Sequence, residues 1–380
     1  MTCREYRINK KLKIKKHRKM IVALLIIIVI VVVVIFMSTP QWGRLPQGES
    51  LQRIETSPNF RDGKFQNSVP RLEQPSFLPA LINFLTTKVE NQRPTKPIPT
   101  MKTDLKKLDR NENLMVWLGH SSLFIQIDSI RILVDPVLIT ASPVSFFNRP
   151  FKGTEVYSPD DIPEVDYLLI THDHFDHLDY RTIKRLRDRI GTIITGLGVG
   201  EHFRRWKFPN DKIIELDWSD QQILSEKITL HALPAEHFSG RTSPDSDQSQ
   251  WLSFMIEAPS STIFISGDTG YGQHFYEIGK QFPNIDLALI EFGSYSYGYR
   301  DIHIYPDHFP LVVRALNVKR NFATHNGKFA LGTHPWHEPL EIVAKLNETD
   351  EFNFITPMIG ELIYLTDFSQ QFSKWWRSIM

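Results

Sequence analysis

The sequence predicts a layered α/β fold, in which helices pack against sheets of short, largely apolar strands. The chain has 380 residues, of which 41% are hydrophobic and 23% charged, a composition typical of globular proteins with a full core. From residue 114 onward, short runs rich in β-branched and aromatic residues alternate with segments of helical spacing. Polar residues follow the ends of the apolar runs, which is where α/β folds place their chemistry.

Residues 20–37 form one uninterrupted apolar run, long enough to span a bilayer as a helix. The run exceeds the apolar region of about 7–15 residues found in a cleavable signal peptide, and no convincing A-x-A cleavage site follows it. A buried helix of a soluble protein fits less well, because the run is apolar on every face. We therefore predict one transmembrane signal anchor, with a cleaved signal peptide as the alternative.

The charge of the chain is unevenly distributed. Nine basic residues and one acidic residue precede the apolar run, so residues 1–19 form a basic tail of net charge +8. Because the whole chain carries +1, the remainder carries −7, which argues against a body that binds nucleic acid. Basic clusters mark the cytoplasmic side of membrane spans. We expect a cytoplasmic N-terminus and a body on the periplasmic or outer side.

Between the apolar run and the α/β pattern lies a segment of different composition. Residues 38–113 are rich in proline and polar residues and predict an irregular tether and N-terminal wrap, with a short apolar patch at 77–85. Residues 114–380 form the expected main domain. The single cysteine, Cys3, precedes the apolar run, so the body has no disulfide and no thiolate site. Any metal in the body must use histidine and carboxylate ligands.

The elements of the main domain follow from the pattern of apolar residues. Strands are expected at 114–120, 122–128, 130–136, 165–172, 191–195, 212–217, 227–235, 251–258, 261–268, 287–293 and 321–325. Helices are expected at 180–190, 274–282, 308–318 and 339–347. Such a mixture of apolar strands and helices indicates layered sheets covered by helices.

The segment "THDHFDHLD", residues 171–179, follows a buried strand and carries the strongest functional signal. His172 and His174 lie two positions apart and can point at one centre, and Asp176 and His177 can point at a second. Imidazole nitrogen and carboxylate oxygen are ligands that Zn²⁺ readily takes. The density of these residues predicts a metal site rather than a solvated loop.

This segment resembles the H-x-H-x-D-H signature of the metallo-β-lactamase-fold hydrolases. In chain order, "VWLGHSSLFIQIDSIRILVDPVL", "ALPAEHFSGR", "ISGDTGY" and "ATHNGKFAL" are similar to the other segments of that fold, from about residue 114 to about 339. The resemblance implies a four-layer αββα sandwich. It also implies two metal sites. The first would use His172, His174 and His237, the second Asp176, His177 and His325, and Asp268 would bridge both.

Two metal ions sharing a carboxylate activate water and stabilise both the attacking and the leaving oxygen of a displacement. We expect two zinc ions, with iron or manganese as alternatives for such ligands. Asp268 alone would also suit a turn. His334 and His337 compete with His325 for the last ligand position, and His325 is preferred because a strand ends there. His120 is expected near the site but not as a ligand.

The branch of the family is indicated by "RDIHIYPDHFPLVV", which resembles a segment shared by N-acylphosphatidylethanolamine-hydrolysing phospholipase D and ascorbate-phosphate-type lactonases. His303 and Pro306 match that segment, whereas His308 departs from it. His303 is expected to act in catalysis beside Asp176 and Asp268, with a purely structural role as the alternative. True β-lactamases of the fold typically lack the bridging aspartate, so antibiotic hydrolysis is disfavoured.

The expected function is a membrane-anchored dinuclear-metal hydrolase that uses a metal-bridging hydroxide on a phosphodiester such as an N-acyl phosphatidylethanolamine. The alternatives are a lactone or carboxyl-ester hydrolase on the same metals, taking a small-molecule ester, and an inactive tethered metal-binding protein. At the C-terminus, the tryptophans of "FSKWWRSIM" suit either a membrane interface or core packing.

Overall fold

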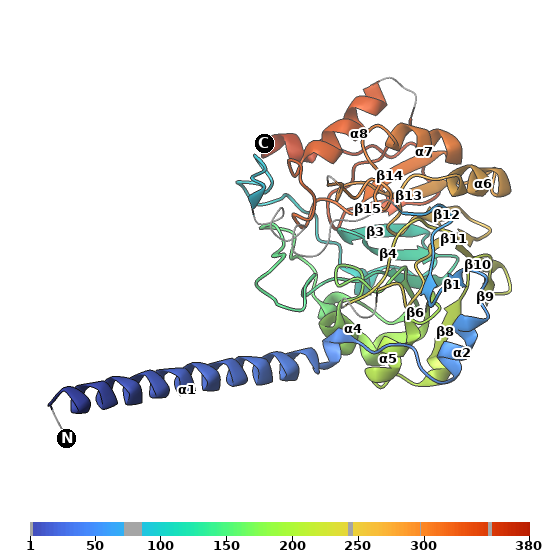
Figure 1. Ribbon diagram of the computed structural model, residues 1–380. Coiled ribbons are helices and arrows are strands. Elements are labelled where there is room, and N and C mark those ends of the chain that lie inside the picture. Colours follow the sequence, from blue (N-terminus) through green and yellow to red (C-terminus); the bar gives the residue numbers. More distant parts are fainter. Residues whose placement is uncertain (1–2, 72–85, 242–245, 297, 349–351) are drawn as a thin grey trace. The chain divides into compact units, whose positions relative to one another are not determined.

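The structure is a computed structural model that describes residues 3–71, 86–241, 246–296, 298–348 and 352–380. The chain divides into two compact units, Met1–Trp42 and Gly43–Met380. Helix α1 (Cys3–Met37) accounts for most of the first unit (Figure 1). Its part Lys13–Met37 contains an 18-residue window with a mean hydropathy of 3.8 and, by length and composition, is the one helix among the described residues that could cross a membrane.

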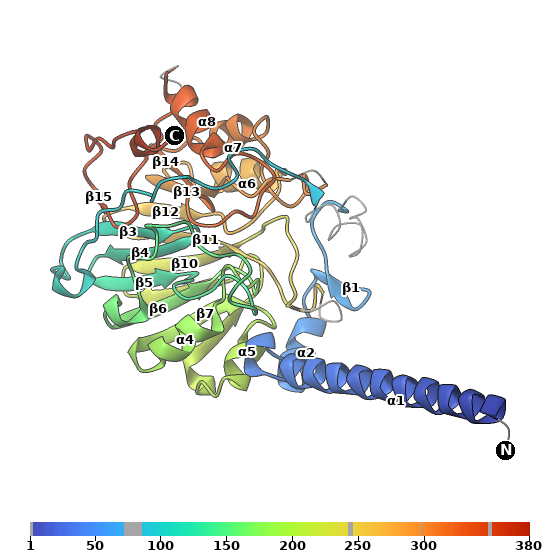
Figure 2. The same cartoon turned by 90° about the vertical axis from the view of Figure 1, so that its left-hand side faces the viewer.

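The second unit contains two large sheets (Figure 2). One has seven strands in the order β15-β3-β4-β5-β6-β7-β8, and the other has six in the order β14-β13-β12-β11-β10-β9. The strands of the seven-stranded sheet are β3 (Leu114–Gly119), β4 (Ser122–Ile127), β5 (Ile130–Val134), β6 (Val165–Ile170), β7 (Ile190–Gly196), β8 (Ile213–Leu216) and β15 (Leu362–Tyr364). The strands of the six-stranded sheet are β9 (Gln221–Ser225), β10 (Ile228–Leu233), β11 (Ser253–Glu257), β12 (Thr262–Ile265), β13 (Leu287–Glu291) and β14 (Arg320–Thr324).

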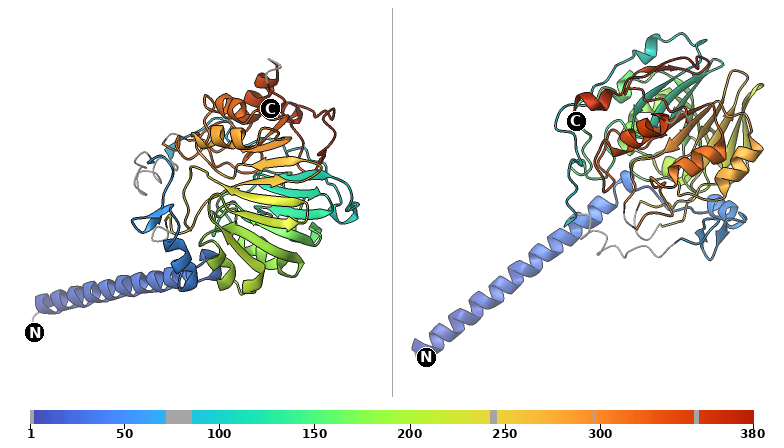
Figure 3. Two further views of the ribbon diagram at one scale, coloured as in Figure 1. Left: turned by 90° about the vertical axis from the view of Figure 1, so that its right-hand side faces the viewer. Right: turned by 90° about the horizontal axis from the view of Figure 1, so that it is seen from above.

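The sheets pack face to face, and helices cover both outer faces (Figures 1 and 3). The largest apolar cluster joins the inner faces, with Trp117 and Ile125 from one sheet and Phe254 and Phe322 from the other. A second cluster packs the seven-stranded sheet against α4 (Tyr180–Leu186) and α5 (Gly200–Arg205). A third packs the six-stranded sheet against α6 (His274–Gln281), α7 (Phe309–Leu316) and α8 (Glu338–Glu348). The expected αββα sandwich is therefore confirmed.

The expected strands and helices of the main domain are all present, with small differences at their ends. The helix expected at 180–190 ends at Leu186 and continues as a 3₁₀ turn, because β7 already begins at Ile190. The strands β9 and β15 and the helix α5 were not expected. They are short, and two of them are only partly apolar, so their patterns fall below what periodicity detects.

The N-terminal wrap contains the helix α2 (Glu49–Glu55) and a two-stranded hairpin, β1 (Phe60–Arg61) and β2 (Lys64–Phe65). The remainder of residues 38–113 is largely irregular wherever the structure describes it. The apolar patch at 77–85 lies outside the described residues. Short elements of this kind have no stability of their own, so the wrap depends on its contacts with the main domain.

The C-terminal tryptophans belong to the core. Trp375 and Trp376 are 5% and 0% exposed and join the apolar cluster between the sheets. The Trp376 indole donates to Glu341 Oε1 of α8, which also pairs with Arg377. The membrane-interface interpretation of these two residues is wrong, because side chains buried this deeply cannot meet a lipid.

Candidate metal centre

The predicted ligands all follow the carboxyl ends of strands. In one sheet β5, β6 and β7 run parallel, and the loop after β6 carries the motif at 171–179. In the other sheet β12, β13 and β14 run parallel, and Asp268 and His325 follow β12 and β14. His237 follows β10. Parallel strands end at the same edge of a sheet, so residues as far apart in the sequence as His172 and His325 meet at one place.

The first ligand group contains His172, His174, His237 and Asp268, whose ligand atoms lie within 4.8 Å of one another. His174 Nδ1 is 2.9 Å from His172 Nε2 and 3.3 Å from His237 Nε2. His237 donates from Nδ1 to the Ile302 carbonyl at 2.9 Å, so its Nε2 presents a lone pair. Burial above all lowers the pKa of His172 and of His237 well below the ordinary value, which leaves both rings neutral.

The second group contains Asp176, His177, His325 and also His120. His325 Nε2 is 3.3 Å from Asp176 Oδ2, and His177 donates from Nδ1 to Asp135 Oδ2 at 2.8 Å. Burial lowers the pKa of His325, but Asp268 and Asp176 outweigh it and raise this pKa to about 9. The carboxylates thus stabilise positive charge at this point, whether a proton or a metal ion supplies it.

Asp268 lies between the two groups. Its carboxylate is 3.9 Å from His172 Nε2 and 3.7 Å from His237 Nε2 on one side. On the other side it is 3.2 Å from His177 Nε2 and 3.1 Å from His325 Nε2. One carboxylate therefore reaches the imidazoles of both groups.

The donor set fits metal ions. Three of its buried atoms have no hydrogen-bond partner among the described residues: His177 Nε2, His325 Nε2 and Asp268 Oδ1. Buried polar atoms are rarely left unpaired, and nitrogen lone pairs that face one another need a cation between them. Neutral imidazoles and carboxylates are the ligands that Zn²⁺ and similar metals use.

His120 belongs to the second group by position, but its contacts are not those of a ligand. Its Nε2 donates to Asp176 Oδ2 at 3.1 Å, so this nitrogen carries a proton. Burial is the main cause that lowers the pKa of His120 to about 3, and the ring is neutral. His120 therefore orients Asp176, as expected from its position near the site.

His303 approaches the centre from the segment before α7. Its Nδ1 donates to the buried Glu291 Oε1 at 3.2 Å, and its ring stacks on His325 with centroids 5.4 Å apart. Together with Asp268 and His325 it forms a third group of potential ligand atoms. Because Glu291 holds Nδ1, the Nε2 atom is the one left to face the centre.

The two competing histidines lie elsewhere. His334 is buried and its Nε2 is 2.8 Å from the Gly293 carbonyl. Neither His334 nor His337 belongs to a group of potential ligands among the described residues. The preference for His325 agrees with this placement.

The backbone at the centre departs from ordinary conformations. His120, Asp135 and His325 have φ values of 58°, 41° and 62°. Residues other than glycine rarely adopt this left-handed region. At these three positions the main chain turns sharply just after a strand and aims the side chain at the centre.

Two acidic residues that support the centre were missed by the sequence analysis. Asp135 follows β5 and accepts from His177 Nδ1 and from the amide and hydroxyl of Thr171. Asp173 accepts from Gly240 N and Ser249 Oγ and is 3.1 Å from His202 Nε2. Asp173 lies inside the motif and Asp135 outside it, but neither position in the sequence shows which histidine the carboxylate contacts.

The comparisons with known proteins agree with the fold. The model of the family described as "Beta-lactamase superfamily domain" matches residues 130–326, which is more than half of the chain. The chain belongs to this superfamily. The matched part includes every one of the seven predicted ligands.

Proteins that resemble the chain include bacterial and eukaryotic ones. An uncharacterized protein of Mycobacterium tuberculosis is 33% identical over 85% of this chain and 88% of its own length. The N-acyl-phosphatidylethanolamine-hydrolyzing phospholipase D 1 of Caenorhabditis elegans is 27% identical over 66% of this chain and 75% of its own length. The crystal structure of a possible metal-dependent hydrolase from Veillonella parvula superposes with a TM-score of 0.53 at 15% identity, covering 67% of this chain and 99% of that chain.

Membership of the superfamily and the two ligand groups make the chain a metal-dependent hydrolase of the metallo-β-lactamase fold. The histidines and aspartates of these groups lie close enough together to hold metal ions, which such a hydrolase requires.

Proposed function

We propose that the protein is a membrane-anchored phosphodiesterase that cleaves the head group of a phospholipid with two metal ions. The observation that carries this proposal is the position of Asp268, whose carboxylate lies between the two ligand groups. Two metals that share a ligand are the arrangement used for in-line displacement at phosphorus. The relative in Caenorhabditis elegans, whose name describes a phospholipid hydrolase, supports the same substrate class.

His172, His174 and His237 would hold one ion, Asp176, His177 and His325 the other, and Asp268 both. Such a pair of ions, zinc in the first place, supplies a lowered pKa of water and a countercharge for the phosphoryl oxygens. Asp135 and the Ile302 carbonyl fix the tautomers of His177 and His237, so that Nε2 of each ring presents a lone pair.

His303 would provide the proton for the leaving group. Its Nδ1 donates to Glu291, which is 1% exposed, so Nε2 carries a proton for the departing oxygen in the imidazolium form, for which the Glu291 carboxylate is the countercharge. A histidine in this position serves as a general acid when its nitrogen comes within hydrogen-bonding distance of that oxygen. Asp176 and Asp268 keep the ligand histidines oriented through the reaction.

The anchor is proposed to hold the body at a lipid surface on the outer side of the membrane. The helix Lys13–Met37 has the length and hydropathy of a span, and the basic cluster of residues 1–19 precedes its apolar part. A basic cluster on that side favours a cytoplasmic N-terminus. A reporter fused after Met380 that is active only outside the cytoplasm is the expected result, and a reporter active only inside would overturn this orientation.

The test of the activity uses the full chain in detergent after reconstitution with zinc. We expect turnover of an N-acyl phosphatidylethanolamine in mixed micelles, two metal equivalents per chain, and a loss of more than about 100-fold in Asp268→Asn. Asp179→Asn serves as the matched control, because Asp179 is an equally buried carboxylate that caps α4. Faster turnover of a lactone would identify the alternative ester hydrolase, and metal binding without turnover of either substrate would identify an inactive binding protein.

A further inference from the structure

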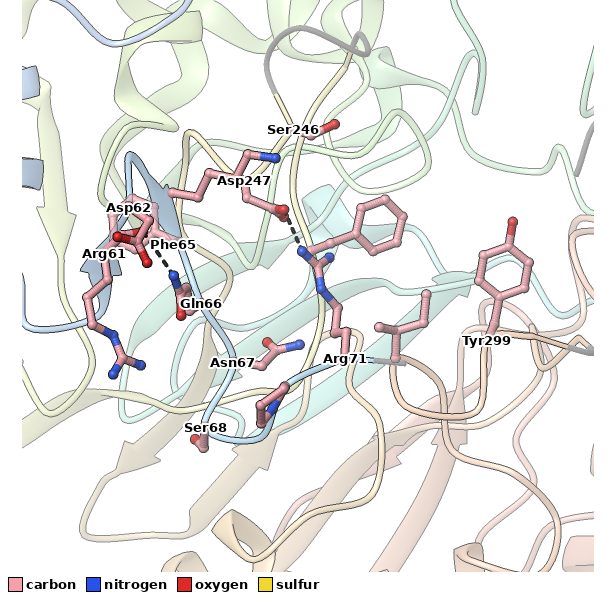
Figure 4. Close-up of a pocket in the computed structure, with 14 residues that line it drawn as sticks. Arg61, Asp62, Phe65, Gln66, Asn67, Ser68, Arg71, Ser246, Asp247 and Tyr299 are labelled. Atoms are coloured by element: carbon pink, nitrogen blue, oxygen red, sulfur yellow. Dashed lines mark hydrogen bonds and ion pairs between the residues drawn. The ribbon is translucent and has the colours of Figure 1, made fainter. Parts of the chain in front are cut away.

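A large pocket opens beside the metal centre, and its wall comes mainly from the N-terminal wrap. Its volume is about 800 Å³, within the range of ligand sites in proteins. Residues 61–71 supply most of the wall, and Phe238, Asp247, Tyr299 and Ile302 supply the remainder (Figure 4). These wrap residues precede the part of the chain that matches the family model.

The pocket and the metal centre share residues. The Phe238 ring lies 4.3 Å from the His174 ring, measured between centroids, and the Ile302 carbonyl accepts the hydrogen bond from His237 Nδ1. Asn67 Oδ1 accepts from the His237 amide at 3.0 Å. The neighbouring Ser68 amide donates to Glu236 Oε2 at 3.1 Å. The wrap is thus fastened to the chain on both sides of a predicted ligand.

Asn67 has a second polar atom that these contacts leave unused. The residue is 7% exposed, and its Nδ2 is buried without a hydrogen-bond partner among the described residues. In Figure 4 this nitrogen points toward the part of the pocket where Arg71 lies, whereas Arg61 extends toward the opposite side. A buried amide donor left unpaired costs free energy, which an oxygen atom of a ligand would recover.

Arg71 lines the same pocket as this donor. Its guanidinium pairs with Asp247 at 2.5 Å and stands 5.9 Å from the Phe238 ring centroid. The ion pair with Asp247 uses only some of the five N–H donors of the Arg71 guanidinium. Arg61 and Lys64 have no ion pair among the described residues, so the pocket holds three cations against the carboxylates of Asp62 and Asp247. The excess of positive charge favours an anionic ligand.

We propose that this pocket binds the glycerophosphate part of the substrate, with Asn67 Nδ2 and the Arg71 guanidinium donating to its oxygen atoms. The inference rests on the proposed function and deepens it, because it states which of the two groups joined by the phosphodiester contacts the N-terminal wrap. An oxygen-rich, anionic group matches the two donors and the charge, and Phe238, Tyr299 and Ile302 provide surface for its carbon atoms.

The test compares two probes on the full-length, zinc-loaded protein by isothermal titration calorimetry. Inorganic phosphate offers only phosphoryl oxygen atoms, whereas sn-glycerol 3-phosphate also offers the glycerol oxygen and carbon atoms that the pocket would contact. We expect the native protein to bind the glycerol ester about 10-fold more tightly or better, since hydrogen bonds to charged groups are worth about that factor. Equal affinity for both probes in the native protein would overturn the proposal.

Asn67→Asp is the decisive variant, because it keeps the acceptor for the His237 amide and replaces only the Nδ2 donor. It should lose the preference for the glycerol ester and keep its affinity for inorganic phosphate and its two metals. Asn210→Asp, an exposed site away from the pocket, makes the same change of charge and should behave as the native protein. If Asn67→Asp fails to fold, Arg71→Gln is compared in the same way, and an unchanged preference in the folded variant refutes the assignment.

The binding comparison does not depend on turnover. If the native protein prefers the glycerol ester but cleaves no phosphodiester, the result supports the role of the pocket and refutes the proposed function. If the protein hydrolyses the phospholipid without any preference for the glycerol ester, the result supports the proposed function and refutes the role of the pocket. For the lipid itself, Asn67→Asp should lower kcat/KM by the same factor on acylated and deacylated substrates, because the donor meets the polar part only.

Discussion

Asp135→Asn should weaken metal binding although Asp135 itself would touch no metal. The carboxylate is 1% exposed and accepts three hydrogen bonds, from His177 Nδ1 at 2.8 Å and from the Thr171 hydroxyl and amide at 2.6 and 2.9 Å. An asparagine has one acceptor oxygen. In either orientation its NH₂ group therefore opposes a donor, and at least one buried donor loses its partner.

The size of the effect follows from these contacts. An unpaired buried donor costs about 1–3 kcal/mol of folding stability. The loss of the carboxylate that fixes His177 costs about 10–100-fold in metal affinity, or about 1.4–2.7 kcal/mol. The variant should fold, bind its second metal weakly, and release it to a chelator at a 10–100-fold lower chelator concentration.

The assay is a competition titration with a chelator, followed by elemental analysis and by thermal unfolding of the metal-free protein. Asp179→Asn provides the comparison, because Asp179 is 2% exposed and accepts from Ile139 N, Thr140 N and Thr182 Oγ1 without touching a predicted ligand. It should lose stability but not metal affinity. Equal chelator midpoints for Asp135→Asn and the native protein would refute the role assigned to Asp135.

Three further predictions concern the bridge, a buried lysine and the C-terminus. Asp268→Ala should leave a folded protein with less than two metal equivalents and no turnover, and activity like that of the native protein would show that the bridge is assigned wrongly. Burial lowers the pKa of Lys328 to about 8 from 10.5. Between pH 8 and 10.5 the unfolded chain keeps this proton and the folded protein does not. The contribution of Lys328 to the free energy of unfolding should therefore rise by about 3 kcal/mol over that interval. Urea titrations should show this rise in the native protein and its loss in Lys328→Met. Trp376→Ala should destabilise the body by about 3–5 kcal/mol, and an unchanged urea midpoint would contradict its place in the core.

The sequence alone was sufficient for the part of the site in which chemistry and spacing coincide. His172, His174, Asp176 and His177 stand within six positions after an apolar strand. The family resemblance supplied His237, Asp268 and His325, of which the last two lie at strand ends that the apolar pattern marked. Their convergence in the structure follows from parallel strands that end at common edges.

The supporting contacts were out of reach because they join distant, isolated residues. Asn67 meets His237 across 170 positions, and Glu291 meets His303 only because β13 ends beside the segment before α7. Trp376 illustrates the opposite difficulty. An aromatic residue beside cationic neighbours suits a membrane surface and a core equally well until burial is known.

The sharp turns at His120, Asp135 and His325 have a consequence for how the protein divides its sequence between folding and chemistry. A left-handed conformation at a residue other than glycine costs about 1–3 kcal/mol. The packing of the two sheets must therefore offset this cost at three residues. Glycine would adopt these angles without penalty and would remove the side chain that the centre requires. The substitution His325→Gly would thus relieve backbone strain and at the same time remove a predicted metal ligand. Selection for stability alone would therefore favour the loss of this centre.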